Sequence, residues 1–151
     1  MKLTPALLAL ALLGAAGAAQ AAGNCTIALK GDDAMKFDLK EVTVSASCAK
    51  ITLELTHTGK MPVAAMGHNI VLTRTPDMAA VVRDGLKGGL ANQYLQAGDA
   101  RVIANTNMIG GGQKATSSFA GNKLTAGGDY SFFCSFPGHS ILMKGKVNVT
   151  R

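Results

Sequence analysis

The chain has 151 residues, of which 48% are hydrophobic and 16% are charged, and its formal net charge is +6. This length suits one domain with a substantial core and is too short for two. The basic residues are scattered and form no run interleaved with aromatic residues, which argues against nucleic-acid binding and favours a mild preference for acidic partner surfaces. Solvation without any specific partner is the simpler explanation for most of the lysines.

The first 21 residues have the pattern of a secretory signal peptide. Lys2 gives a basic start, an apolar run covers residues 7–13, and small residues lead to Ala19-Gln20-Ala21, an A-x-A cleavage site. The apolar run is too short to span a bilayer, which argues against an uncleaved anchor, and Cys25 lies too late for a lipoprotein. We expect residues 1–21 to be removed and residues 22–151 to form a single exported domain.

Most of the remaining sequence alternates between apolar and polar residues over short runs, and glycines separate these runs. Such alternation is typical of strands with one buried and one solvated face. The number and spacing of the runs predict an all-β fold, an antiparallel Greek-key β-sandwich or barrel. The expected strands are 26–29, 41–44, 51–56, 69–74, 101–109, 115–119, 130–134 and 144–149.

One helix is expected in the long connection after the fourth strand. Thr75-Pro76-Asp77 supplies an N-cap, a proline and an acid for a first turn, and Gly88-Gly89 ends the pattern. Between them Met78, Val81, Val82 and Leu86 recur at helical spacing, so residues 76–87 are predicted to be a short amphipathic helix. Further on, Leu124, Gly128 and Tyr130 resemble the tyrosine corner of Greek-key sandwiches.

The chain contains three cysteines, an odd number for an exported protein. Oxidising compartments favour pairing, so one disulfide and one free thiol are expected. Cys25 and Cys48 flank the first strands, and their pairing would close a loop worth about 3 kcal/mol in the chain-entropy model. Cys134 then remains free for chemistry.

The segment 132–143 gathers three metal-binding side chains within ten residues. Cys134 and Met143 are soft donors suited to Cu(I), while the imidazole of His139 binds copper in either oxidation state. A cysteine thiol that coordinates a metal ion is fully deprotonated, so metal binding would give the free Cys134 a function. Taken alone, the motif also allows Met143 to be a core side chain and Cys134 a buried structural thiol.

A further nitrogen ligand must come from His57 or His68. His68 follows Gly67, whose small size permits close backbone approach to a metal, and precedes Asn69, which can hydrogen-bond across the site. His57 continues the alternating strand 51–56 and should point inward. It is either a buried histidine whose nitrogens are bonded to the backbone or a pH-sensitive group near the metal.

Residues 23–151 resemble the azurin family of bacterial periplasmic cupredoxins over nearly their whole length. The resemblance is carried by Cys25 and Cys48, by the segments 66–69 and 77–85, and above all by 132–145. It implies a type 1 (blue) copper site in a cupredoxin-like fold located in the periplasm. The sequence contains no Trp, and Ile70 occupies a position where some azurins carry a core tryptophan.

The same resemblance implies a role for each site residue. His68, Cys134 and His139 would form a trigonal plane around one copper ion, with Met143 a weak axial ligand and the Gly67 carbonyl on the opposite axis. Asn69 and Phe136 would support these ligands, and Cys25–Cys48 would be the structural disulfide.

A filled coordination sphere without neighbouring proton carriers suits a single-electron shuttle rather than an enzyme. We expect brief docking of redox partners, a c-type cytochrome or a periplasmic oxidoreductase by resemblance, on a small apolar patch. The patch is expected to contain Met66, Leu86, Phe136, Pro137 and the ring edge of His139. Partial burial is the alternative for Met66 and Leu86, and the protein is expected to be a monomer that binds neither nucleic acid nor membranes.

Three other functions remain open at this stage. The first is copper storage or delivery, and the second is a copper enzyme such as a nitrite reductase or oxidase. The short chain and its three histidines argue against the enzyme. The third is a zinc site, because two imidazoles and one thiolate also accept zinc.

Overall fold

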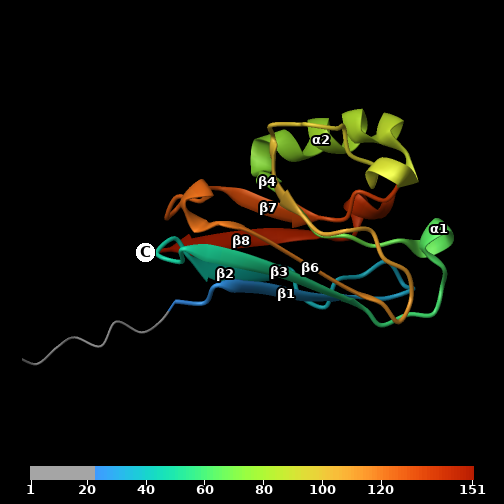
Figure 1. Cartoon of the computed structure of the whole chain (residues 1–151), viewed down its shortest axis with the longest axis horizontal. Helices are drawn as coiled ribbons and strands as arrows, with labels where there is room; N and C mark the ends of the chain where they lie inside the picture. The colour runs from blue at the N-terminus through green and yellow to red at the C-terminus, as the bar shows by residue number, and fades with distance from the viewer. Residues whose placement is uncertain (1–22) are drawn as a thin grey trace, which may run out of the picture.

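The computed structural model describes residues 23–151, so the predicted signal peptide lies outside the described residues. Two sheets pack face to face (Figure 1). The smaller sheet has the order β1 (Thr26–Gly31), β3 (Lys50–His57) and β6 (Lys114–Ala120). The larger sheet has the order β2 (Glu41–Ser45), β8 (Lys144–Thr150), β7 (Tyr130–Phe133), β4 (Val71–Arg74) and β5 (Val102–Asn105). Each of the eight expected strands overlaps one of these.

The all-β sandwich is confirmed, but its sheets are mixed rather than wholly antiparallel, and the described strands form no closed barrel. β1 runs parallel to β3, and β2 runs parallel to β8, whereas the other pairs are antiparallel. The parallel pairing of β1 with β3 arises because β2, the strand between them in sequence, belongs to the other sheet. The chain therefore crosses the sandwich twice before β3 lies beside β1.

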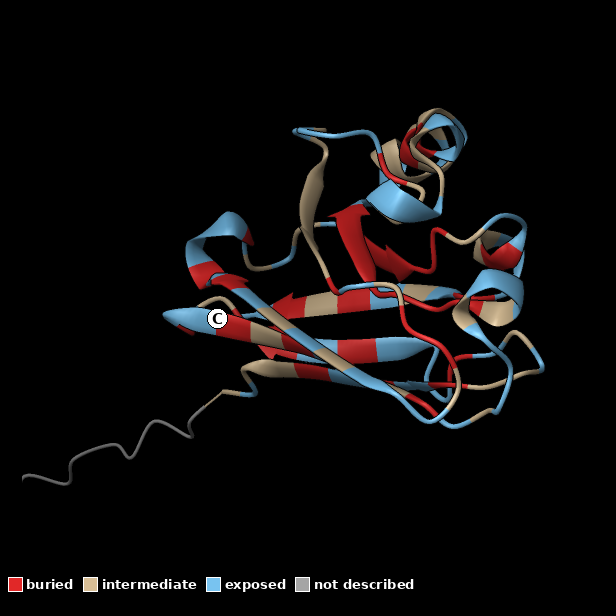
Figure 2. Cartoon of the chain, turned by 45° about the vertical axis from the view of Figure 1, so that its right-hand side comes forward, coloured by how far each residue is buried: buried red, intermediate tan, exposed pale blue. Residues whose placement is uncertain are grey.

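Alternating side chains build the core between the sheets, as the bands along the strands in Figure 2 show. In β3, Ile51, Leu53 and Leu55 are buried while Glu54 is exposed. β7 differs, because all four of its residues are buried. Its Phe132 faces the sandwich core, and Phe133 packs on the outer side against Val71, Val81 and Leu95.

The outer cluster around Phe133 exists because a helix covers this part of the larger sheet. α2 (Met78–Gly85) lies above β4 and β7 in Figure 1. 3-10 turns at Thr75–Asp77 and Leu86–Gly88 flank it, and together these segments span the predicted helix. A second helix, α1 (Val63–Met66), was not predicted, because its four residues are too few to show a helical period. No helix in the described part of the chain is long and apolar enough to cross a membrane.

Two expected local features close the end of the sandwich where β1 begins. The Tyr130 hydroxyl accepts a hydrogen bond from the backbone N–H of Thr125 at 3.0 Å, as in a tyrosine corner. Cys25 and Cys48 form a disulfide, and Cys134 is the free, buried cysteine. The predicted arrangement of one disulfide and one free cysteine is confirmed.

Replacing both Cys25 and Cys48 with Ala should lower the free energy of unfolding by about 3 kcal/mol. Without the disulfide, the unfolded chain regains the conformational entropy of an open loop. Denaturant titration of the oxidised protein and of the double variant measures this difference. Since the disulfide lies at the end of β1 opposite Gly31, spectra of a metal bound near His57 and His68 should not change. A spectral change would show that the two ends are coupled.

Candidate metal centre

Strand register brings two distant parts of the sequence together at one end of the larger sheet. β4 and β7 are antiparallel, and Val71 at the start of β4 lies opposite Phe133 at the end of β7. Phe133 in turn lies opposite Lys144 at the start of β8. His68 therefore precedes β4, Cys134 follows β7 and Met143 precedes β8 at the same place, while His139 lies in the loop between β7 and β8.

Three of these side chains form a compact cluster of possible metal ligands. One ligand atom from each of His68, Cys134 and His139 lies within 4.8 Å of the other two, and all three residues are buried. The Cys134 Sγ is 3.7 Å from Nδ1 of His139 and 3.7 Å from the carbonyl oxygen of Gly67. That oxygen is also 2.9 Å from Nδ1 of His68. His68, Cys134 and His139 thus meet around one point, and the Gly67 carbonyl oxygen lies close to two of them.

The orientation of His68 is fixed by a group that the sequence did not reveal. Its Nε2 donates a hydrogen bond to the carbonyl of Asp32 at 2.8 Å, which leaves Nδ1 facing the cluster. An outer hydrogen bond of this kind holds the tautomer that a metal requires. A backbone carbonyl is offered by every residue, so no sequence pattern could have identified Asp32.

Met143 is fully buried, and the backbone attaches it firmly to Cys134. The Cys134 N–H donates to the Met143 carbonyl at 3.0 Å, and the Met143 N–H donates to the His139 carbonyl at 2.7 Å. Gly31 permits the close packing here, since a Cβ at that position would lie 2.7 Å from the His68 ring and 3.3 Å from Cε of Met143. The turn leading to His139 also needs glycine, because Gly138 has φ +82°.

Burial keeps these donors electrically neutral. It raises the pKa of the Cys134 thiol to about 12, although hydrogen bonds from the backbone N–H groups of Asn69 and Phe136 act in the opposite direction. Burial also lowers the pKa of His139 to about 4, with a further contribution from the charges of His68 and His57, and it lowers the pKa of His68. At neutral pH the two imidazoles are therefore free of competing protons, while the thiol needs a nearby cation to ionise.

A buried hydrogen-bond network joins the loops that carry the ligands. The Asn69 side-chain oxygen accepts from the Ser135 N–H at 2.9 Å, and its amide donates to the Ser135 hydroxyl at 2.8 Å. The Ser135 hydroxyl donates to the carbonyl of Gln93 at 2.6 Å. Asn69 was predicted in this bracing position, whereas Ser135 and Gln93 were not.

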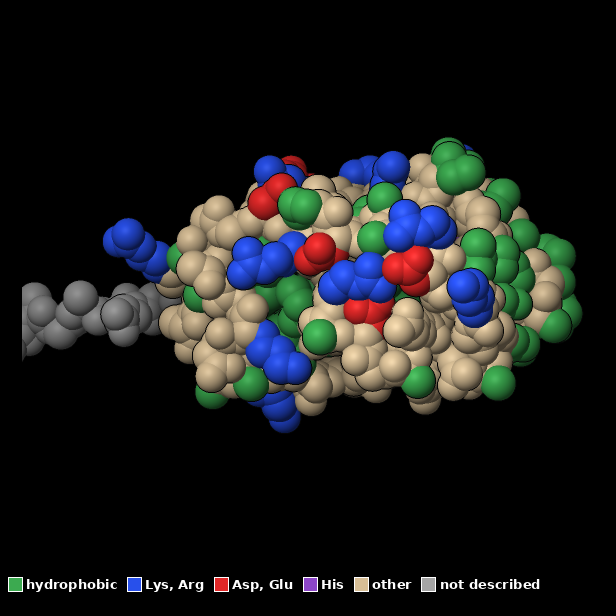
Figure 3. Space-filling model, turned by 90° about the horizontal axis from the view of Figure 1, so that it is seen from above, with side chains coloured by type: hydrophobic (Ala, Val, Ile, Leu, Met, Phe, Trp, Pro, Cys, Tyr) green, Lys and Arg blue, Asp and Glu red, His purple; other side chains and the backbone are tan. Residues whose placement is uncertain are grey.

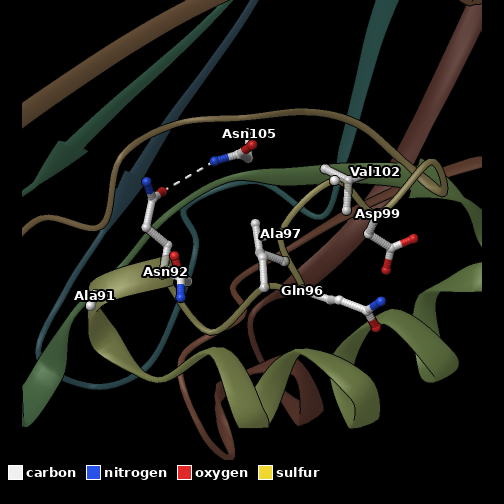
Figure 4. Close-up of a pocket in the computed structure, with 10 residues that line it drawn as sticks. Ala91, Asn92, Gln96, Ala97, Asp99, Val102 and Asn105 are labelled. Carbon is white, nitrogen blue, oxygen red and sulfur yellow. Dashed lines mark hydrogen bonds between the residues drawn. The ribbon is translucent and has the colours of Figure 1, made fainter.

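Gln93 extends the network to a surface hollow of about 320 Å³ beside α2 (Figure 4). Its side-chain oxygen accepts a hydrogen bond from Asn105 at 3.1 Å, which is drawn as a dashed line in that figure. Five of its ten lining residues carry polar side chains, and none of His68, Cys134, His139 and Met143 is among them. The cluster itself is therefore not the wall of this hollow.

The donor set fits a copper ion better than a hard cation. Thiol and thioether sulfur favour soft ions, and imidazole suits copper in both of its oxidation states. The four side chains of His68, Cys134, His139 and Met143 are all buried, so the donor atoms are shielded from solvent. A single ion enclosed by this set is suited to a change of oxidation state.

Comparison with known proteins decides the family. The family model described as copper binding proteins, plastocyanin/azurin family, matches residues 23–150. The chain belongs to this family. It is 51% identical to an azurin of Bordetella pertussis over 93% of both chains, and 49% identical to an azurin of Alcaligenes faecalis over 83% of this chain and 98% of that one.

A solved structure agrees with the sequence relatives. The azurin Az-iso2 of Methylomonas sp. strain J aligns with a TM-score of 0.80 and 37% identity, over 84% of this chain and 98% of its own. Membership of the azurin branch, together with the His68–Cys134–His139 cluster, makes this chain a blue-copper electron-transfer protein and not an enzyme.

His57 adopts the first of its two predicted roles in this copper-protein fold. It is fully buried, its Nε2 donates to the Met66 carbonyl at 2.8 Å, and its Nδ1 accepts from the Gly59 N–H at 3.1 Å. Its ring stacks on that of His68, with 4.2 Å between centroids. Both nitrogens have backbone partners, and the ring packs against an imidazole of the candidate metal centre.

The residues expected in the docking patch differ in exposure. Leu86 and Pro137 are exposed, whereas Met66 and Phe136 are half-buried. His139 is only 3% exposed, so the predicted ring edge at the surface is small. The Phe136 ring lies 4.5 Å from the His139 ring and 5.3 Å from that of Tyr94, between the site and the flanking loop.

Ser135→Ala should lower the free energy of unfolding by about 1–3 kcal/mol, because it leaves the Gln93 carbonyl and the Asn69 amide without a buried partner. Chemical denaturation of the metal-free protein measures this change. Ser140→Ala is the matched control, since the half-buried Ser140 makes no side-chain hydrogen bond within residues 23–151. Equal stability of the two variants would show that the network contributes nothing.

Proposed function

We propose that this protein carries single electrons between periplasmic redox proteins. His68, Cys134 and His139 would hold the copper ion, and Met143 and the Gly67 carbonyl would be weaker additional donors. The observation that supports this most strongly is the buried convergence of these residues at one end of the larger sheet. The Cys25–Cys48 disulfide suits an oxidising compartment, and the predicted signal peptide at residues 1–21 would deliver the chain there.

Copper supplies the one-electron couple in this proposal, and the protein supplies a dry and rigid enclosure. His68 and His139 present unprotonated nitrogens at neutral pH because burial lowers the pKa of each. Cys134 would hold the ion as a thiolate, and hydrogen bonds from the backbone N–H groups of Asn69 and Phe136 would stabilise that charged form. The Asn69–Ser135–Gln93 network holds the loops in place, so that little rearrangement accompanies a change of charge.

The exit for the electron is the short path from the site through His139 to the surface. The ring of His139 contacts Phe136, and the neighbouring Pro137 is exposed. Met66 and Leu86 would complete an apolar patch on which a c-type cytochrome or a periplasmic oxidoreductase docks for a brief encounter. The protein would act as a monomer, because transient partners need this surface free.

Adding Cu(II) to the purified protein should produce an intense blue thiolate-to-copper band, and Cys134→Ser should abolish it. The band requires sulfur from the residue whose Sγ lies among the two histidines. Visible absorption and electron paramagnetic resonance spectra measure the result, with Ser140→Ala as the control that keeps the band. A blue band that persisted in the Cys134 variant would reject the ligand set.

Copper exchange and reduction of the same copper-loaded protein distinguish electron transfer from copper storage and from zinc binding. Slow copper exchange together with fast reversible reduction supports electron transfer, whereas rapid exchange of the ion would indicate storage or delivery. Protein that takes up only zinc would be colourless and redox-silent.

Met66→Lys or Leu86→Lys should slow electron exchange with a soluble c-type cytochrome roughly tenfold, because each places a solvated charge in an apolar contact. Stopped-flow mixing measures the rate, and an unchanged visible spectrum shows that the copper site is intact. Ala120→Lys adds the same charge at the exposed end of β6, where it lies opposite Lys50, and serves as the control. Equal rates for all three variants would place the docking surface elsewhere.

A further inference from the structure

We propose that unpaired lysines border the apolar docking end and select redox partners that present an acidic rim around their own contact surface. This inference rests on the proposed function, because it concerns the surface through which the electron leaves. It adds the sign of the charge that the partner must carry.

Lysines accompany the exposed apolar side chains at this end. Lys60 precedes Met61, which is 38% exposed, and Lys87 follows Leu86, which is 48% exposed. The Lys40 ammonium donates to the carbonyl of Leu142 at 2.6 Å, in the loop between His139 and Met143. In Figure 3 the hydrophobic side chains gather at the right-hand end, with basic side chains at their border and no acidic side chain among them.

Three acidic residues near this end accept hydrogen bonds from the backbone or pair with arginines. Asp33 accepts from the backbone N–H groups of Lys60 and Met61 at 2.8 and 3.3 Å, and Asp32 accepts from those of Ala34 and Lys36 at 2.9 and 3.3 Å. Asp84, close to Leu86 in sequence, pairs with the guanidinium groups of Arg83 and Arg101 at 3.0 Å each. These carboxylates are directed into the protein's own backbone and arginines.

The lysines, by contrast, are not neutralised by ion pairs. Within residues 23–151 no lysine nitrogen lies within 4.0 Å of a carboxylate oxygen, since the ion pairs found there involve only His57, Arg83 and Arg101. The ammonium groups of Lys60 and Lys87 make no hydrogen bond within residues 23–151 either and are available to a partner. Rim charges of this kind act mainly on the rate of encounter and on the choice of partner.

The position of a lysine decides whether a docking partner senses its charge. The Debye length is about 10 Å at 0.1 M salt, so charges farther away are largely screened. β3 begins at Lys50 and ends at His57, whose ring stacks on His68, and eight extended residues place Lys50 roughly 23 Å from the site. Lys50 and Lys123, near the disulfide end, thus form a natural control pair for Lys60 and Lys87.

The test compares two double variants of the copper-loaded protein that change the net charge equally. Lys60→Glu/Lys87→Glu alters the rim, and Lys50→Glu/Lys123→Glu alters the far end. Lys40 is left in place because its short bond to the Leu142 carbonyl, at 2.6 Å, holds the ligand loop, whereas the Lys123 bond to the Ile103 carbonyl is long, at 3.4 Å, and exposed. Oxidation of the reduced protein is followed by stopped flow with the hexacyanoferrate(III) anion and with the tris(phenanthroline)cobalt(III) cation, at 10 mM and 200 mM ionic strength.

We expect the anion to react with the unaltered protein faster at low salt, and the cation more slowly. The rim variant should lose about tenfold of its rate with the anion at low salt and gain with the cation, while the far-end variant should change less than about twofold. Equal effects of both variants, or no effect of the rim variant, would overturn the proposal. Lys60→Gln/Lys87→Gln provides the same comparison if the Glu variant does not fold.

A protein partner completes the test. A c-type cytochrome with an acidic rim around its haem edge should exchange electrons faster than one with a basic rim, and the rim variant should reverse this order. The same order in both proteins would overturn the proposal. Failure of the proposed function would look different, because then neither inorganic oxidant would change the colour of the copper-loaded protein.

Discussion

Burial of the donor atoms is the constraint on which the rest of the structure depends. Removing a thiol from water raises its pKa, here to about 12 for Cys134, so the pocket does not stabilise a thiolate by itself. The same burial lowers the pKa of His139 to about 4 and keeps its ring neutral. Burial thus disfavours both charged forms, the protonated imidazole of His139 and the metal-free thiolate of Cys134. A cation that binds both sulfur and nitrogen would stabilise the thiolate and would use the unprotonated imidazole as a ligand. The pocket therefore favours a bound copper ion over a protonated site without metal.

The sheet makes that arrangement rigid, because no single loop carries the donors alone. Register between β4, β7 and β8 sets Val71 against Phe133 and Phe133 against Lys144, and a slip of one residue would turn the neighbouring ligands to opposite faces. α2 covers the outer side of β7 and keeps Phe133 buried. The Ser135–Gln93 bond then attaches the ligand loop to the segment beyond that helix. Packing of the whole larger sheet is in this way connected to the metal-binding geometry.

Much of this was visible in the sequence, because the ligands are side chains with distinctive chemistry at fixed spacing. Cys134, His139 and Met143 lie in one segment, strand alternation revealed all eight strands, and cysteine arithmetic revealed the disulfide. Contacts made through backbone atoms could not be predicted, and they include the Asp32 carbonyl on His68 and the Gln93 carbonyl on Ser135. The parallel pairing of β1 with β3 was also hidden, since it depends on which sheet β2 joins and not on any local pattern.

Enclosure of the site creates a second requirement, since an electron must still leave through a wall that excludes water. In the proposed function the nearly buried His139 meets this requirement, because its ring is in contact with Phe136 at the base of an apolar surface. An apolar contact excludes water but discriminates poorly between partners, because most proteins expose some apolar area. Charges around the contact can supply that discrimination without entering the site, since they act across several ångströms and leave the dry contact unchanged. On the proposed docking surface, the separation of an apolar centre from a basic border would let one small surface serve both fast transfer and choice of partner.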